Sequence, residues 1–190
     1  KNINFSINVK EGLIINGKLY SGTNDLGGEV GHIRLAPDGP VGFGKAGSFE
    51  GFCSGGGIAQ LAKSIVKEKI EKGIDVGFCR DLAESGDITA KDVARAAYEG
   101  NPVAFEIIKI SAEYLGRGLS VLIDIINPEC IVIGSIYARN ESLFKPHVDR
   151  ILREEAIPAA VEVCKIKPAL LGESVGDYAA LCVAVYSHDY

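Results

Sequence analysis

The sequence predicts an α/β fold, because strand-like and helix-like hydrophobic patterns follow one another in a definite order. Apolar and polar residues alternate near the N-terminus around a hairpin signal, and from residue 58 onward helical stripes alternate with short apolar runs. An N-terminal β-meander followed by alternating helices and strands is typical of an α/β domain. The 190 residues are 47% hydrophobic, which suits one domain with a sizeable core and excludes a disordered chain.

The first 20 residues predict the meander. A half-buried strand is indicated by apolar residues that alternate with polar ones at Ile3, Phe5, Ile7 and Val9. Asn16-Gly17 stands between two further apolar runs, residues 13–15 and 18–20, and is a strong hairpin signal because both turn positions need a positive φ. Residues 21–57 are irregular and rich in glycine, and the length of this segment favours a functional loop.

The rest of the chain predicts helices that alternate with strands. We expect helices over residues 58–70, from a capping box at 89–92, and over 102–126. Gly116 and Gly118 lie inside the long helix, where each costs up to about 1 kcal/mol relative to Ala, so we expect a close packing contact there. The pattern ends with a strand at 130–133, a helix at 142–155, a strand at 161–167 and a closing helix at 175–187.

Composition and charge exclude several functions for this chain on its own. Its 20 basic and 25 acidic side chains give a net charge of −5, which argues against direct binding to the phosphate backbone of a nucleic acid. The apolar runs are too short to span a bilayer, so we expect no membrane partner, and no signal peptide is present. The five scattered cysteines form no Cys-x-x-Cys pair and indicate reduced thiols in a cytoplasmic protein: Cys53, Cys79, Cys130, Cys164 and Cys182. Because the chain starts at Lys1 and contains no Met, we expect a piece of a longer polypeptide.

Candidate binding residues gather in the irregular segment. Glu29, His32 and Glu50 lie there, with Asp38 nearby. Carboxylates and an imidazole beside glycines can hydrogen-bond the adjacent hydroxyls of a polyhydroxylated ligand such as a sugar. The alternative is that these residues are solvated loop side chains without a ligand.

Other motifs carry little chemistry. His32 has no second His or Cys at metal-ligand spacing, and no Ser-x-x-Lys or Gly-x-Ser-x-Gly element indicates a nucleophile. The glycines at 55–57 precede a predicted helix and could contact an anion, but a flexible helix entry explains them equally well. We expect His147 and His188 at the surface.

The segment Gly28-Glu29-Val30-Gly31-His32, together with Ser48-Phe49-Glu50, resembles the ROK family, named for repressors, open reading frames and sugar kinases. The resemblance continues along almost the whole chain, at residues 16–22, 37–40, 88–94, 101–102, 115–119 and 127–134. It implies an actin-like (ribonuclease-H-like) fold. Residues 1–190 would then form a single C-terminal lobe with a sugar-binding loop region at 21–57, and the N-terminal lobe would be absent from this chain.

In this family a sugar lies between two lobes, and its hydroxyls bind the Glu and His of Glu-x-Gly-His and a later Glu. The resemblance therefore implies that Glu29, His32 and Glu50 bind a monosaccharide or amino sugar. The family also holds zinc through the His and three cysteines, whose positions here are Val41, Phe43 and Ser48. We therefore expect no zinc, and a loop that holds its shape by packing through Phe43 and Phe49.

The nucleotide motifs of the family are degenerate in this sequence. In the phosphate-contacting stretch, residues 6–12, only Gly12 remains, and the adenosine turn is reduced to Gly134 and the residues after it. Glycine matters in such turns because a Cβ blocks close approach to an anion. Gly12 and Gly134 are thus weak candidates for cofactor binding, and the catalytic Asp would belong to the absent lobe. We expect no cofactor, with ATP and Mg²⁺ needed only if the parent protein is a kinase.

Retained sugar residues beside degraded phosphate motifs favour a sugar-responsive transcriptional regulator. Its helix-turn-helix would lie upstream of Lys1, so DNA would be contacted only through a module outside this chain. The alternative is a fragment of an ATP-dependent hexose or amino-sugar kinase, similar to a glucokinase; this chain alone would not be an enzyme. A third possibility is a lobe kept only for assembly. We expect a homo-oligomer, with the long helix and its glycine pair as a contact.

Overall fold

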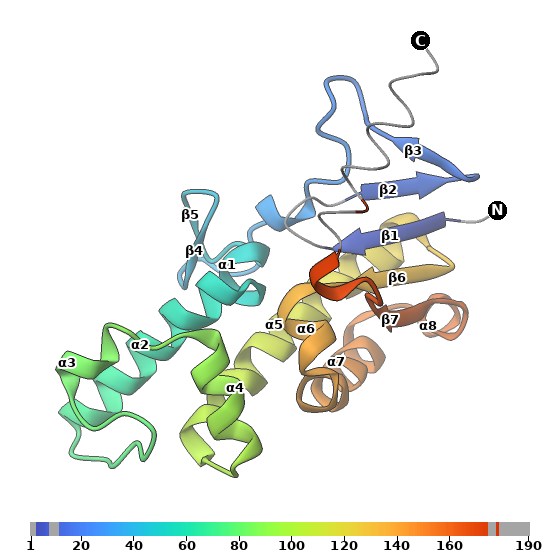
Figure 1. The fold of residues 1–190 in the computed structure, drawn as a ribbon. Coiled ribbons are helices and arrows are strands. Elements are labelled where there is room, and N and C mark those ends of the chain that lie inside the picture. Colours follow the sequence, from blue (N-terminus) through green and yellow to red (C-terminus); the bar gives the residue numbers. More distant parts are fainter. Residues whose placement is uncertain (1–2, 8–11, 175–177, 179–190) are drawn as a thin grey trace.

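The sheet of the molecule is built on the predicted meander. The computed structural model describes residues 3–7, 12–174 and 178, and in it β1 (Ile3–Ile7), β2 (Gly12–Ile15) and β3 (Lys18–Tyr20) are antiparallel neighbours. β6 (Cys130–Ile133) pairs in parallel with β1, and β7 (Lys165–Pro168) pairs in parallel with β6. The resulting order, β3-β2-β1-β6-β7, gives a mixed sheet beside a helical body (Figure 1) and confirms the predicted α/β class.

The hairpin was predicted correctly from Asn16-Gly17. Both residues have positive φ, 54° and 77°, as a two-residue turn with the twist of the flanking strands requires. Several predictions fall on residues that the structure does not describe. These are Val9 of the first strand, Cys182, His188 and all of the closing helix at 175–187 apart from residue 178.

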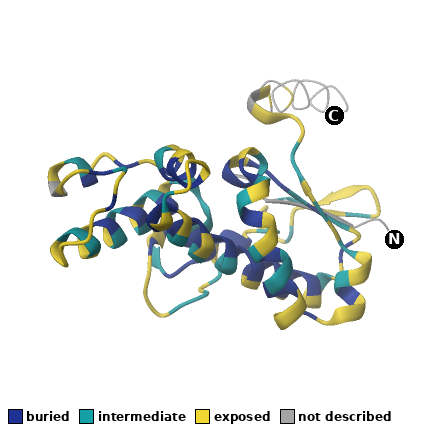
Figure 2. Cartoon of the chain, turned by 90° about the horizontal axis from the view of Figure 1, so that it is seen from below, coloured by how far each residue is buried: buried dark blue, intermediate teal, exposed yellow. Residues whose placement is uncertain are grey.

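One long helix organises the core. α5 (Pro102–Ile126) packs against α7 (Glu141–Glu155), α4 (Ala90–Tyr98), α2 (Gly55–Glu71) and α1 (Phe49–Cys53). The inward face of β6 adds Ile131 and Ile133 to the same core, and Figure 2 shows the buried positions concentrated along these helices. Among the described residues, no helix is both long and apolar enough to cross a membrane.

The glycines inside α5 have the packing role that was predicted. A Cβ built on Gly116 would lie 2.6 Å from Cβ of Ile151 on α7, and one on Gly118 would lie 2.4 Å from Cζ of Phe49 on α1. Carbon atoms in contact lie about 3.5–4.0 Å apart, so both positions need glycine for close helix approach. The glycine pair is therefore used inside the chain, and its predicted role as an oligomer contact is wrong.

Side-chain caps fix where the main helices begin. Thr89 Oγ1 accepts a hydrogen bond from the Asp92 amide at 3.3 Å, and Asp92 Oδ2 accepts one from the Thr89 amide at 3.1 Å, which confirms the capping box. Asn101 Oδ1 accepts hydrogen bonds from the amides of Val103 and Ala104, both at 3.0 Å, at the start of α5. The side-chain Nδ2 of Asn101 also donates to the carbonyl of Val76 at 2.7 Å, which connects the start of α5 to the preceding loop.

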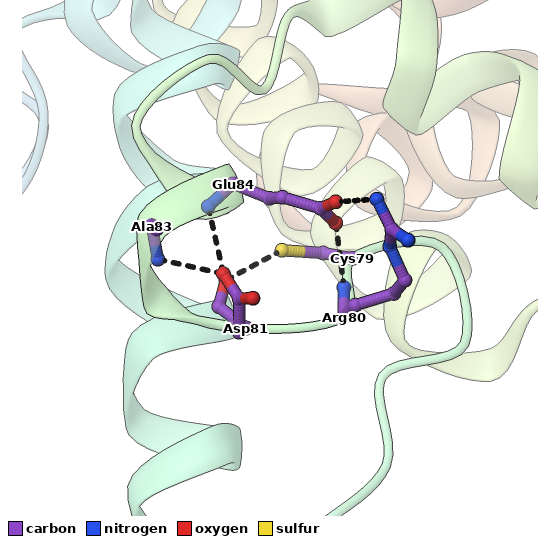
Figure 3. Close-up of polar contacts among 5 residues, drawn as sticks. All are labelled: Cys79, Arg80, Asp81, Ala83 and Glu84. Atoms are coloured by element: carbon purple, nitrogen blue, oxygen red, sulfur yellow. Dashed lines mark hydrogen bonds and ion pairs between the residues drawn. The ribbon is translucent and has the colours of Figure 1, made fainter.

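The connection between α2 and α4 contains α3 (Leu82–Ser85), a helix that was not predicted. Asp81 Oδ1 accepts hydrogen bonds from the amides of Ala83 and Glu84 at 2.9 and 3.0 Å, and the Glu84 carboxylate pairs with the Arg80 side chain (Figure 3). Cys79 Sγ donates to the carbonyl of Asp81 at 3.3 Å. Local polar contacts thus stabilise this turn, and the buried side chain of Cys79 packs into the hydrophobic core.

The last predicted strand is placed wrongly at its start. Residues 158–163 form α8 (Pro158–Val163), and the strand begins only at Lys165. Pro158 is favourable in the first helical turn because its missing N–H would have no intrahelical partner there. The remaining elements are η1 (Val30–His32), β4 (Val41–Gly42), β5 (Lys45–Ala46), α6 (Ser135–Arg139) and η2 (Gly172–Ser174).

Two side-chain environments qualify the sequence predictions. The described cysteines, Cys53, Cys79, Cys130 and Cys164, are all free, as expected for reduced thiols. His147 is not fully at the surface: it is half-buried on α7 with its ring 5.5 Å from that of Phe105, and this burial lowers the pKa of His147.

Candidate functional site

The irregular segment folds so that residues 33–34 contact residues 48–49. Phe49 donates its amide hydrogen to the carbonyl of Ile33 at 2.7 Å, and Arg34 forms an antiparallel bridge with Ser48. These contacts place the end of η1 beside the start of α1. Glu29, which directly precedes η1, and Glu50, in the first turn of α1, are brought together in this way.

The start of α1 is fixed by a buried serine. Ser48 Oγ donates to the carbonyl of Gly42 and accepts from the amide of Gly51, both at 3.1 Å. The next residue, Phe49, is only 2% exposed and packs end-on against Gly118 of α5. Glu50 therefore projects from a turn whose backbone and neighbouring side chain have little freedom.

A small cavity of about 80 Å³ lies where this turn meets the sheet. Glu29, Gly31, Glu50 and Ser54 supply its polar lining, and Gly134 and Ser135 close it at the carboxyl end of β6. In α/β sheets, ligands bind most often at the carboxyl ends of parallel strands. The apolar lining comes from several elements: Phe43, Cys53, Phe49, Leu115, Ile133, Ile136, Tyr137 and Phe144.

The ionisable groups on the apolar wall stay neutral at neutral pH. Burial raises the pKa of the Cys53 thiol well above its usual value and that of Tyr137 to about 12. A neutral thiol is a poor nucleophile, so Cys53 acts as an apolar wall residue. Carboxylates at the rim and an uncharged wall behind them form an amphipathic cavity, which suits a ligand with both hydroxyl and C–H groups.

The predicted site residues are not all placed alike. Glu29 and Glu50 line the same cavity, with Gly134 beside them. His32 does not line it: the imidazole is exposed at the end of η1 and makes an edge contact with the ring of Phe43, with centroids 5.7 Å apart. Gly12 begins β2 opposite Ser6 and does not line this cavity. Asp38 is an exposed loop residue.

The loop at the expected zinc position is held by hydrogen bonds. β4 and β5 form a hairpin, and the Gln60 side chain both donates to the carbonyl and accepts from the amide of Val41, at 3.0 Å each. Arg34 Nη1 donates to the carbonyl of Ala46 at 2.7 Å. The predicted packing is correct for Phe49 and wrong for Phe43, which is 54% exposed. Among the described residues, no group of three or more His, Cys, Asp and Glu side chains is arranged to hold a metal.

A second, larger cavity was not predicted from the sequence. It has a volume of about 1200 Å³ and lies between the start of α2, at Gly55 and Gly56, the start of α4 and α6. Ser135 and Ile136 line both cavities, so the two adjoin at the end of β6. Its basic lining residues, Lys63, Lys91, Arg95 and Arg139, outnumber the acidic Asp87 and Glu99, and Arg95 among them forms an ion pair with Asp92 at 3.1 Å. This excess favours an anionic occupant. The sequence signals for it were the glycines at 55–56 and the residues that follow Gly134, the reduced adenosine turn.

The comparison with known protein families identifies the chain. The sequence profile of the ROK family matches residues 9–185, nearly the whole sequence. The chain belongs to the ROK family. Structural similarity to ROK proteins also confirms the actin-like fold: a ROK family glucokinase from Streptomyces griseus, solved in complex with glucose and AMPPNP, aligns with a TM-score of 0.73 at 26% identity. That alignment covers 92% of this chain and 57% of the glucokinase.

ROK relatives of both functional kinds are similar to this chain. It is 33% identical to a glucokinase from Halalkalibacterium halodurans over 92% of this chain and 52% of that protein. It is 26% identical to the DNA-binding transcriptional dual regulator NagC of Escherichia coli over 78% of this chain and 34% of that protein. The chain thus spans about half or less of these relatives, and membership of the ROK family leaves both a kinase and a regulator open.

Proposed function

We propose that this chain is the sugar-binding lobe of a ROK protein and that Glu29 and Glu50 bind the hydroxyls of a monosaccharide or amino sugar. The observation that carries the proposal is that both carboxylates line one small amphipathic cavity at the carboxyl end of β6. The glucose complex of the Streptomyces griseus relative supports a sugar as the ligand class.

The chemistry of the cavity suits part of a sugar ring. A carboxylate is an acceptor with two oxygens, so Glu29 and Glu50 can each receive one or two hydroxyl hydrogens. The cavity of about 80 Å³ is partly open, so a sugar need not fit inside it completely. One edge of the sugar would lie between the carboxylates, with His32 as a third partner.

For the parent protein we propose a sugar-responsive transcriptional regulator. The degenerate phosphate stretch and the replaced zinc cysteines distinguish this chain from the family's kinase pattern, whereas its sugar residues are intact. Sugar would act by binding one arrangement of the protein more tightly than another, with DNA contacted through a module outside this chain. We propose a homo-oligomer, since a symmetric operator calls for a symmetric protein. This chain alone would need neither zinc nor ATP.

One observation favours the kinase alternative. The larger cavity adjoins the sugar cavity at Ser135 and carries an excess of basic side chains, as a binding site for a nucleotide polyphosphate would. If ATP occupies it, the parent protein is an ATP-dependent hexose or amino-sugar kinase whose catalytic Asp lies outside this chain.

Thermal unfolding with and without ligands tests the proposal. At tenfold excess over its Kd, a sugar stabilises the native state by about 1.4 kcal/mol, which raises Tm by about 3–6 °C for a chain of this size. We expect glucose, N-acetylglucosamine or xylose to protect the wild type and the control Glu162→Gln, an exposed change on α8, but not Glu50→Gln. Protection by ATP and Mg²⁺ that Lys91→Ala removes would instead favour the kinase.

The coding sequence upstream of Lys1 separates the two parent proteins independently. A helix-turn-helix there would support the regulator. An Asp-x-Gly-x-Thr strand and a catalytic Asp without such a module would support the kinase. If no sugar protects the wild-type chain, the sugar-binding proposal is wrong.

A further inference from the structure

Phe43 occupies a backbone position that disfavours it. It is the first residue of the two-residue turn between β4 and β5, where Phe43 and Gly44 have φ of 50° and 68°. A turn with two positive φ values favours Asn, Asp or Gly, and a bulky side chain is strained there. The strain is not offset by burial, because the ring is 54% exposed. A strained, exposed aromatic residue beside a cavity indicates a functional position.

The direction of the Phe43 ring is set by its neighbours. Both strands of the hairpin are anchored. On β4, Gln60 binds both backbone groups of Val41 and the Gly42 carbonyl accepts from Ser48 Oγ; on β5, the Ala46 carbonyl accepts from Arg34 Nη1. Lys45 Nζ donates to the carbonyl of His32 at 2.7 Å, which connects the hairpin to the end of η1. The turn therefore presents its aromatic ring from a fixed backbone.

The ring lies at the candidate sugar site with one face available. Phe43 lines the cavity that Glu29 and Glu50 also line. Its contact with the His32 ring is nearly perpendicular, with an interplanar angle of 76°, and such a contact covers at most one face of the phenyl ring. Because the ring is 54% exposed and also lines the cavity, part of it can meet a ligand held by the carboxylates.

We propose that Phe43 is a stacking platform for the sugar. The carboxylates would take hydroxyl groups at one edge of a pyranose, while a face of the sugar that carries C–H groups would lie on the phenyl ring. Such a face is apolar and slightly positive, and it complements the negative face of an aromatic ring. The inference rests on the proposed sugar binding and adds a specificity element, selecting pyranoses with several C–H groups on one face.

Two substitutions separate binding from folding. Phe43→Asn replaces the ring with a residue that the turn favours, so Tm should stay the same or rise. Its affinity for glucose, N-acetylglucosamine or xylose, whichever binds the wild type best, should fall about three- to tenfold. Phe43→Trp keeps an aromatic platform and should retain the affinity. Phe105→Ala, which removes a partly exposed ring on α5 away from the cavity, is the matched control and should leave sugar affinity unchanged.

Saturation-transfer NMR measures both affinity and contact for weakly bound sugars. Irradiation of the aromatic protons should transfer saturation to the ring C–H protons of the sugar in the wild type, and the transfer should fall sharply in Phe43→Asn. Unchanged transfer and affinity in Phe43→Asn, with affinity lost in Glu50→Gln, would overturn the stacking role and leave sugar binding intact. If the wild type binds none of the three sugars, both the stacking role and the proposed function are wrong.

Discussion

Gly118→Ala is predicted to damage the sugar cavity from the opposite side of α1. The new Cβ would lie 2.4 Å from Cζ and 2.6 Å from both Cε atoms of Phe49. An ordinary carbon contact is about 3.5 Å, so the tip of the ring must withdraw by about 1.1 Å. Phe49 is 2% exposed and lines the cavity next to Glu50, so a shift of its ring changes the cavity wall.

The net effect on stability combines two opposing terms. Overpacking costs about 1–3 kcal/mol, whereas replacing a mid-helix Gly with Ala returns up to about 1 kcal/mol of helix propensity. The two terms leave a net loss of up to about 3 kcal/mol in the free energy of unfolding, seen as a fall in Tm of up to roughly 12 °C. Because the displaced ring belongs to the cavity wall beside Glu50, sugar affinity should fall by at least about tenfold, which is more than the change in stability explains.

Gly116→Ala is the matched control for this prediction. Its Cβ would lie 2.6 Å from Cβ and 2.8 Å from Cγ2 of Ile151 on α7, so the overpacking is similar, but the residue that it meets does not line the cavity. Urea unfolding gives the stability of both variants, and saturation-transfer NMR gives their sugar affinity. The reasoning is refuted if Gly118→Ala unfolds like the wild type and binds sugar normally, or if Gly116→Ala loses sugar binding to the same extent.

Three further predictions concern the helix starts. Asn101→Ala should lower the free energy of unfolding by about 2–4 kcal/mol in urea titrations, because it removes the cap of α5 and leaves the buried carbonyl of Val76 without its donor. Hydrogen bonding to the Thr89 side chain lowers the pKa of Asp92 in the folded protein. The Asp92 carboxylate therefore contributes fully to folding stability above about pH 4, and this contribution is lost as pH falls through the folded-state pKa. The difference in stability between wild type and Asp92→Asn should shrink below pH 4. Gly56→Ala lies in the first turn of α2, where a new Cβ would meet Ser54 Oγ at 4.0 Å, an ordinary contact. It should raise stability by about 0.5 kcal/mol, measured by thermal unfolding.

Each of these outcomes can fail in a recognisable way. An Asn101→Ala protein as stable as the wild type would mean that solvent replaces the cap. If the stability difference between wild type and Asp92→Asn is constant from pH 3 to pH 7, the capping box does not contribute to the pH dependence of folding stability. A less stable Gly56→Ala would indicate that the start of α2 needs the freedom of glycine.

The parts of the fold that sequence predicted correctly depend on local signals. Asn16-Gly17 specifies a turn by its own backbone preferences, and the capping box at Thr89 needs only the residues of one helical turn. The start of the last strand was missed because two local signals overlap at residues 158–163. Alternating valines indicate a strand, but Pro158 at the first helical position and Ala160 packed against the core favour a helix.

The candidate site was only partly visible in the sequence. Glu29 and Glu50 were candidates from their place in the irregular segment, and the resemblance to the family gave them a role. Their shared cavity depends on Leu115 and Ile133, which lie far along the chain. Tertiary packing of this kind leaves no local signal. Phe43 was expected to pack inward, and the positive φ of its turn directs it to the rim instead. The larger cavity is formed by three helix starts that only the fold brings together.

Sugar binding between Glu29 and Glu50 is tested most directly by NMR. Glucose, N-acetylglucosamine and xylose are titrated into isotope-labelled protein, and the backbone amide signals are followed. We predict that the amides of Gly31, Glu50 and Gly134 shift together with one Kd, and that Glu50→Gln weakens this Kd by at least about tenfold. Amides on α7 that face solvent serve as the internal reference. Shifts confined to the larger cavity around Thr89 and Arg95, or no shift with any of the three sugars, would contradict the account.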